Sequence, residues 1–137
     1  MIESFSDCDF LNWFPQHKEE FTPEIRNRLA WMYVTNAGYM KGARCNVLIY
    51  KQDLLYVGFQ RFCISGKEIN LDYTAVESNT QKNGIGLELA SRAIDEGLSI
   101  DCSNVTSKVS NAARKLIAKL KQKYPLLTFN ISYTGEP

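Results

Sequence analysis

The chain has 137 residues, of which 45% are hydrophobic and 23% charged, so it can bury a core without metal or disulfide cross-links. Its formal net charge of +1 excludes the strong positive field that is typical of proteins that bind nucleic acid or anionic membranes. We therefore expect one domain over residues 1–137. The acidic start lacks the basic and apolar segments of a signal peptide, and no apolar run is long enough to span a bilayer, so we expect a cytoplasmic protein.

The cysteines and the single histidine, His17, are too scattered to predict a metal site. No two cysteines have the spacing of a zinc-binding or redox pair. Because disulfides are rare in the cytoplasm, we expect free thiols. Cys63 lies in an apolar strand pattern and is predicted to be a small core residue.

The N-terminal third predicts one clear helix. Residues 1–21 are rich in aromatic side chains and are expected to form a short helix or a packed arm that belongs to the same domain. Thr22, Pro23 and Glu24 are typical of a helix start, with a capping residue, a proline at the first position and an acid in the first turn. The helix is expected to end near Gly38.

Three strands follow in a meander, at residues 47–50, 54–64 and 68–76, with short turns between them. The third strand alternates between apolar and polar residues. Continuous alternation puts one set on a buried face and the other on an open face. The apolar set is Ile69, Leu71, Tyr73 and Ala75, and the polar set is Glu68, Asn70, Asp72 and Thr74.

The second half alternates between helices and strands. A helix is predicted to run from the glycine-bearing turn near residue 84 to about residue 97, a strand covers 105–109, a helix covers 111–124, and a last strand covers 126–133. The order of elements favours an α+β domain in which helices flank a mixed, mostly antiparallel sheet.

A polar loop joins the third strand to the second helix and contains two glycines. Backbone N–H groups in such a loop, together with the first turn of the helix, can bind an anion, and glycine lets the backbone approach it closely. The pattern matches neither the dinucleotide fingerprint nor the P-loop. The loop predicts a pyrophosphate site at Gln81, Lys82, Asn83, Gly84, Ile85 and Gly86.

The same six residues resemble the Gln/Arg-x-x-Gly-x-Gly/Ala signature of the GNAT superfamily, whose members are acetyl-CoA-dependent N-acetyltransferases. Two further segments are similar to the family in order and spacing: residues 57–59, which read Val-Gly-Phe, and the Asn111-Ala112 step that opens the third helix. The resemblance covers roughly residues 45–120. It implies the acyl-CoA N-acyltransferase fold.

The resemblance also implies a mechanism in which an amine attacks the thioester of acetyl-CoA directly. The donor is expected to bind at residues 81–86 and near Asn111. The backbone at Ala75 and Val76 is expected to pair with its pantetheine arm, in a gap where the strands 68–76 and 105–109 separate. An N–H group near Val76 would polarise the thioester carbonyl.

Four residues are expected to carry the proton transfers. Asp72, on the polar face of the third strand, is the preferred general base, and Glu77 is the second choice. Many family members have a tyrosine in the last helix that protonates the leaving thiolate, and the resemblance places Ile117 at that position. Tyr124 and Tyr133 are the candidates to replace it.

The sequence thus predicts an N-acetyltransferase that moves an acetyl group from acetyl-CoA to an amine, either a small molecule or a protein, without a metal. The alternative is a non-catalytic protein of the same fold that binds CoA or a partner. The family usually has two strands after the last helix, and only one fits here. This difference predicts a shortened domain, or a partner, a second copy of the chain or another protein, that completes the sheet.

Overall fold

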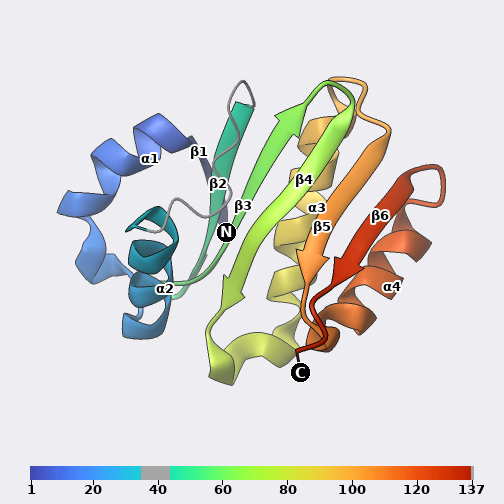
Figure 1. Cartoon of the computed structure of the whole chain (residues 1–137). Helices are drawn as coiled ribbons and strands as arrows, with labels where there is room; N and C mark the ends of the chain where they lie inside the picture. The colour runs from blue at the N-terminus through green and yellow to red at the C-terminus, as the bar shows by residue number, and fades with distance from the viewer. Residues whose placement is uncertain (35–43, 137) are drawn as a thin grey trace.

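The computed structural model describes residues 1–34 and 44–136, and Figure 1 shows their arrangement. In chain order the helices and strands are β1 (Ile2–Ser6), α1 (Asp7–Trp13), α2 (Pro23–Val34), β2 (Arg44–Gln52), β3 (Leu55–Ser65), β4 (Glu68–Val76), α3 (Ile85–Leu98), β5 (Asn104–Val109), α4 (Arg114–Lys123) and β6 (Thr128–Tyr133). Short 3-10 turns precede α2, α3 and α4, and the one before α3 is Ser78–Asn83.

The strands form a single six-stranded sheet in the order β1-β2-β3-β4-β5-β6. The first four strands pair antiparallel, whereas β5 runs parallel to β4 and to β6. The parallel pairs are the ones connected by helices, α3 between β4 and β5 and α4 between β5 and β6, as parallel connections require. The α+β class and the mixed, mostly antiparallel sheet are confirmed.

Each face of the sheet carries its own hydrophobic core. On one face, α3 and α4 pack against residues such as Leu48, Phe62 and Val105. On the other face, α1 and α2 pack against Val47 and Phe59. Figure 1 shows α1 and α2 beside the N-terminal strands and α3 and α4 behind the sheet.

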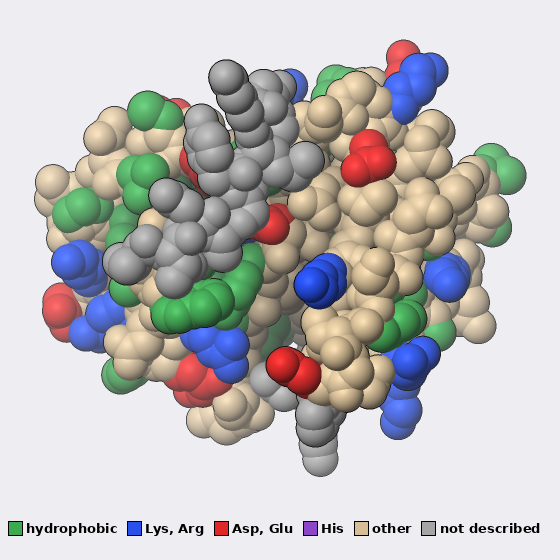
Figure 2. All heavy atoms as spheres, viewed as in Figure 1, with side chains coloured by type: hydrophobic (Ala, Val, Ile, Leu, Met, Phe, Trp, Pro, Cys, Tyr) green, Lys and Arg blue, Asp and Glu red, His purple; other side chains and the backbone are tan. Residues whose placement is uncertain are grey.

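On the face that points away from α3 and α4, the strands β5 and β6 carry polar side chains. The outward residues of β6 alternate with half-buried ones, as expected for a strand with one face in water. In Figure 2, the surface over these two strands is mostly polar side chains and backbone. The exposed residues of β6 are Thr128, Asn130 and Ser132.

The N-terminal segment differs from the expectation in one respect. Residues 7–13 form the expected short helix, but Ile2–Ser6 forms a strand, β1, that extends the sheet by pairing with β2. A five-residue segment with two apolar side chains gives too little periodicity to be recognised as a strand. The expected helix end at Gly38 lies outside the described residues.

The alternation predicted for β4 is wrong beyond Leu71. A β-bulge shifts the register there, so that Arg61 and Phe62 of β3 face Tyr73 and Leu71, and Asp72 is the extra residue. Ile69 and Leu71 consequently pack with α3 and α4. Tyr73 and Ala75 pack on the opposite face, with α2.

Two side chains of β3 hold this bulge. Gln60 is buried, and its amide nitrogen donates to the carbonyls of Arg61 (2.8 Å) and Tyr73 (3.3 Å). Arg61 is also buried and forms ion pairs with Asp72 and with Asp7 of α1, the latter at 2.6 Å. The two carboxylates balance the charge of the buried guanidinium, which burial would otherwise penalise.

The expectation of free thiols is wrong for two of the four cysteines. Cys45 of β2 and Cys63 of β3 face each other in register and form a disulfide, while Cys8 and Cys102 are free. Sequence spacing could not reveal the pair, because their proximity depends on the strand register. Cys63 is a buried core residue, as predicted.

Replacing Arg61 by Met should lower the free energy of unfolding by about 3 kcal/mol, because the carboxylates of Asp7 and Asp72 lose their buried partner. Chemical denaturation measures the change. The matched control is Arg92→Met, on an exposed position of α3, which should change stability by less than about 0.5 kcal/mol. A loss for Arg61→Met no larger than that of the control would show that the ion pairs do not stabilise the bulge.

Candidate active site

The site begins where β4 and β5 stop pairing. Their ladder covers only Glu68–Leu71 on β4, ending at Leu71 and Ser107, although β4 continues to Val76. At the last pair, the Ser107 hydroxyl donates to the Leu71 carbonyl at 2.7 Å. The bulge at Asp72 bends β4 immediately afterwards, so the ladder with β5 does not continue along the rest of β4.

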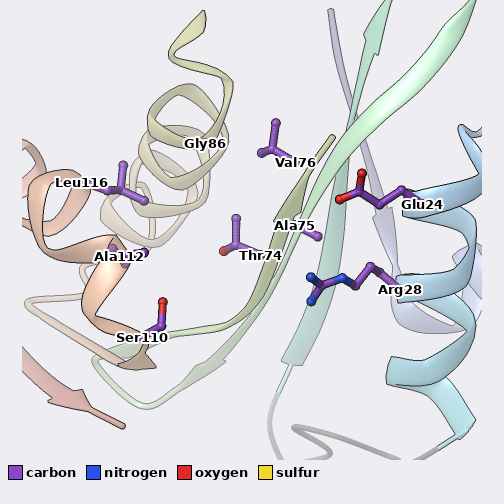
Figure 3. Close-up of a pocket in the computed structure, with 10 residues that line it drawn as sticks. Glu24, Arg28, Thr74, Ala75, Val76, Gly86, Ser110, Ala112 and Leu116 are labelled. Atoms are coloured by element: carbon purple, nitrogen blue, oxygen red, sulfur yellow. The ribbon is translucent and has the colours of Figure 1, made fainter. Parts of the chain in front are cut away.

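A cavity of about 370 Å³ occupies the space that this separation opens. Figure 3 shows its walls: β4 crosses the middle, α2 stands on one side, and α3 with the start of α4 stands on the other. The lining residues are Glu24, Arg28, Thr74, Ala75, Val76, Gly86, Ser110, Ala112, Ala113 and Leu116.

A second cavity of about 290 Å³ shares part of this lining. It extends from the same space toward the point where β4 and β5 separate, and adds Asp72, Ser107 and Lys108 to the walls. The residues common to both cavities are Arg28, Thr74, Ser110, Ala113 and Leu116.

The N-terminus of α3 closes one end of the first cavity. Gly84 precedes the helix with φ at 76°, a left-handed conformation that glycine adopts without strain. The first bond of the helix ladder runs from the Glu88 N–H to the Gly84 carbonyl, so the N–H groups of Ile85, Gly86 and Leu87 have no acceptor within the helix. These groups form the positive end of a helix of 14 residues.

Gly86 is not required by the protein's own packing. An added Cβ would meet only the Val76 side chain, at 3.9 Å, which is an ordinary contact. The Ile85 side chain is buried in the core, and Asn83 is exposed. The side chains of Gln81 and Lys82 lie outside the part of the chain that the structure describes.

Glu24 is the acidic side chain on the α2 wall, and the sequence did not single it out. Its carboxylate accepts hydrogen bonds from the Ser78 hydroxyl (2.8 Å) and the Ser78 N–H (3.2 Å). These bonds, the hydroxyl first, lower the pKa of Glu24 below its usual value. An acid in the first turn of a helix is usually explained by the helix dipole, which is why its role in a cavity went unnoticed.

The two predicted bases lie differently. Asp72 lines the second cavity, where its carboxylate is paired with Arg61; burial nevertheless raises the pKa of Asp72. Glu77 accepts a hydrogen bond from Thr22 and lines a separate cavity near the turn between β2 and β3. Neither Asp72 nor Glu77 is among the described residues that line the first cavity.

The two predicted tyrosines do not line the first or second cavity either. The Tyr124 hydroxyl bonds to Asp95 (2.7 Å) and to the Ser91 carbonyl, both on α3. Burial, followed by the bond to Asp95, raises the pKa of Tyr124 to about 12. The ring of Tyr133 lies under the Arg114 guanidinium, 3.9 Å from its centroid.

The start of α4 contributes small side chains and one hydroxyl. Ser110 lines both cavities, and its hydroxyl makes no capping hydrogen bond to the turn that follows. The Asn111 side chain instead accepts a bond from Arg114 at 3.2 Å. Ile117 is buried in the core, so Leu116 is the residue of this helix that faces the cavity.

Metal ligands and membrane spans are not found in the described residues. Within 1–34 and 44–136, no group of three or more His, Cys, Asp or Glu side chains could hold a metal ion. Over the same residues, no helix combines the length and apolar character that crossing a bilayer requires.

Three solved structures are similar to this chain over most of its length. Ribosomal-protein-S18-alanine N-acetyltransferase from Escherichia coli has 16% identity and a TM-score of 0.57, covering 90% of this chain and 75% of that one. IAA acetyltransferase from Bacillus cereus has 19% identity and a TM-score of 0.55, with the same coverage. An aminoglycoside N-acetyltransferase in complex with CoA has 16% identity and a TM-score of 0.54, covering 90% and 88%.

These likenesses are below 20% identity and therefore show the fold. The chain has the acyl-CoA N-acyltransferase fold of the GNAT superfamily, with a six-stranded sheet flanked by helices. No family model matches the sequence, and no curated protein is detectably similar to it.

Proposed function

We propose that this chain is an acyl-CoA-dependent N-acyltransferase that acetylates an amine. The observation that carries the proposal is the cavity at the separation of β4 and β5. One end of it is the N-terminus of α3, one wall is the stretch of β4 beyond its ladder with β5, and the wall from α2 carries a carboxylate. These are the three things such a reaction needs: an anion site, a site for an extended arm, and a site for an ammonium group.

The donor-binding residues fit acetyl-CoA. The N–H groups of Ile85, Gly86 and Leu87 are directed to the end of the helix, where a pyrophosphate would be stabilised by the dipole. The space above Gly86 is left open by the protein, which fits the close approach of a phosphate. The stretch of β4 at Ala75 and Val76, beyond its ladder with β5, lines the cavity, which puts its backbone within reach of the pantetheine amides.

Acetyl-CoA supplies an activated acyl group, and the protein must position an amine against it. The amine nitrogen forms a bond to the acyl carbon, the carbon–sulfur bond breaks, and the CoA thiolate leaves. One proton goes from the ammonium group to solvent while the Glu24 carboxylate holds that group in the cavity, and a second goes from the attacking nitrogen to the thiolate. A backbone N–H near Val76 polarises the carbonyl.

We assign the contact with the ammonium group to Glu24 rather than to Asp72 or Glu77. Glu24 lines the cavity, and its lowered pKa keeps the carboxylate charged at neutral pH. Asp72 is paired with buried Arg61, and transfer of a proton to it would weaken that pair. Ser110 is the hydroxyl best placed to donate a hydrogen bond to the leaving sulfur, in place of Tyr124 or Tyr133.

The alternative, a non-catalytic protein of the same fold that binds CoA or a partner, is favoured by one observation. The cavity wall from α4 and the turn before it includes Ala112, Ala113 and Leu116, and none of these can donate a proton as a tyrosine would. A thiol with a pKa of ~8.5 leaves without strong acid assistance, so this absence slows the reaction more than it prevents it. CoA binding without transfer to any amine would support the alternative.

Acetyl-CoA at about 100 times its Kd should raise the Tm by about 5–10 °C, because only the folded state binds it. Gly86→Leu should abolish this shift, since the added side chain occupies the space at the start of α3 while leaving the protein's own contacts intact. The control is Ala118→Leu, on the exposed face of α4, which should keep the shift. A full shift in Gly86→Leu would contradict the phosphate site.

Glu24→Gln should lower kcat/KM about 100-fold for any amine that the protein acetylates, because the neutral amide does not attract an ammonium group. Asp72→Asn should lower it less than about tenfold and act mainly on stability. Mass spectrometry of the acetylated amine gives the rates. Glu19→Gln, at a side chain that is 89% exposed, is the matched control. A larger loss in Asp72→Asn than in Glu24→Gln at equal folded fractions would return the role to Asp72.

A further inference from the structure

Helix α2 presents three side chains in a row toward β4. Glu24, Arg28 and Trp31 have the i, i+4, i+7 spacing of one helical face. Figure 3 shows Glu24 and Arg28 extending from α2 toward Ala75 and Val76 of β4, with Ser110, Ala112 and Leu116 on the other side of that strand.

Contacts with Tyr73 fix the middle of this row. The Arg28 guanidinium lies 3.3 Å from the Tyr73 hydroxyl, and the Trp31 ring lies 5.8 Å from the Tyr73 ring. Trp31 is nevertheless 54% exposed, so its surface is accessible at the end of the row. The α2 wall therefore offers a carboxylate, a guanidinium and an aromatic ring, in that order.

The charges along the two cavities change sign. In the first cavity, Glu24 and Arg28 are the charged lining residues. In the second, the lining cations are Arg28 and Lys108, and the one lining carboxylate, Asp72, is already paired with Arg61. The space beside Glu24 thus favours a cation, and the space beyond Arg28 favours an anion.

The distance between these two regions limits the size of the ligand. Four residues of helix correspond to a rise of about 6 Å, and both side chains are directed into the same space. A molecule that contacts both Glu24 and Arg28 has its opposite charges separated by a few bonds.

We propose that the acceptor is a small amine that also carries a carboxylate, an amino acid in the broad sense. Glu24 binds its ammonium group, while Arg28, with Lys108 behind it, binds its carboxylate. This inference rests on the proposed function and adds the chemical class of the acceptor to it. Arg28 is then a residue that determines specificity, and polyamines are disfavoured because Arg28 and Lys108 repel a second ammonium group.

The test is a calorimetric titration of the full chain, with and without bound CoA, using matched ligands. Glycine, β-alanine and 4-aminobutyrate are compared with ethylamine, propylamine, butylamine and spermidine. At least one amino acid should bind about tenfold more tightly than the amine of similar length that lacks the carboxylate. Glu24→Gln should weaken both classes of ligand, because both contain an ammonium group.

Arg28→Met should reduce the preference for the carboxylate about tenfold, because it removes the bidentate donor and keeps much of the side-chain volume. Arg92→Met, which removes a cation from an exposed position that lines neither cavity, should leave the preference unchanged.

Three results would overturn the inference: equal binding of amino acids and plain amines, an unchanged preference in Arg28→Met, or tightest binding of spermidine. These outcomes are separate from failure of the proposed function. If CoA binds and carboxylates are not preferred, the acceptor class is wrong and the donor site stands. If amino acids bind with the expected preference but CoA does not bind, the ligand class stands and the transferase proposal fails.

Discussion

The β-bulge at Asp72 is the feature on which the site depends. The bulge adds one residue to β4 relative to β3. The buried Gln60 side chain donates a hydrogen bond to a backbone carbonyl beside it, and the buried Arg61 side chain pairs with the charge of Asp72. Asp7 of α1 completes the arrangement by pairing with the same guanidinium. The N-terminal helix, the third strand and the bulge are therefore connected by one buried ion cluster.

This constraint explains the separation of the two halves of the sheet. Before the bulge, β4 pairs with β5, and the Ser107–Leu71 hydrogen bond marks the last contact. After the bulge, Tyr73 and Ala75 of β4 pack toward α2, and the ladder with β5 does not continue. The cavity lies beside this part of β4, with one wall from the C-terminal helices and the other from α2, so its lining combines elements from both halves of the chain.

The sequence was sufficient for most of the elements and for the loop that leads into α3, because both depend on local patterns. Helix starts, strand runs and the glycines at 84 and 86 are visible within a window of a few residues. The faces of β4 were predicted incorrectly, since the alternation rule assumes an unbroken strand and the bulge depends on side chains of β3. The position of Glu24 in the cavity wall was missed for the same reason: its position relative to β4 is a property of tertiary packing, as is the register that joins Cys45 to Cys63.

The central claim is that the part of β4 beyond its ladder with β5 and the start of α3 together bind acyl-CoA. Backbone amide NMR of the full chain with added CoA tests it most directly. The largest shift changes should occur at Ile85, Gly86 and Leu87 and along Thr74, Ala75 and Val76, on both sides of the cavity. If CoA leaves these amides unchanged, or shifts mainly residues elsewhere in the domain, the account of the site is wrong.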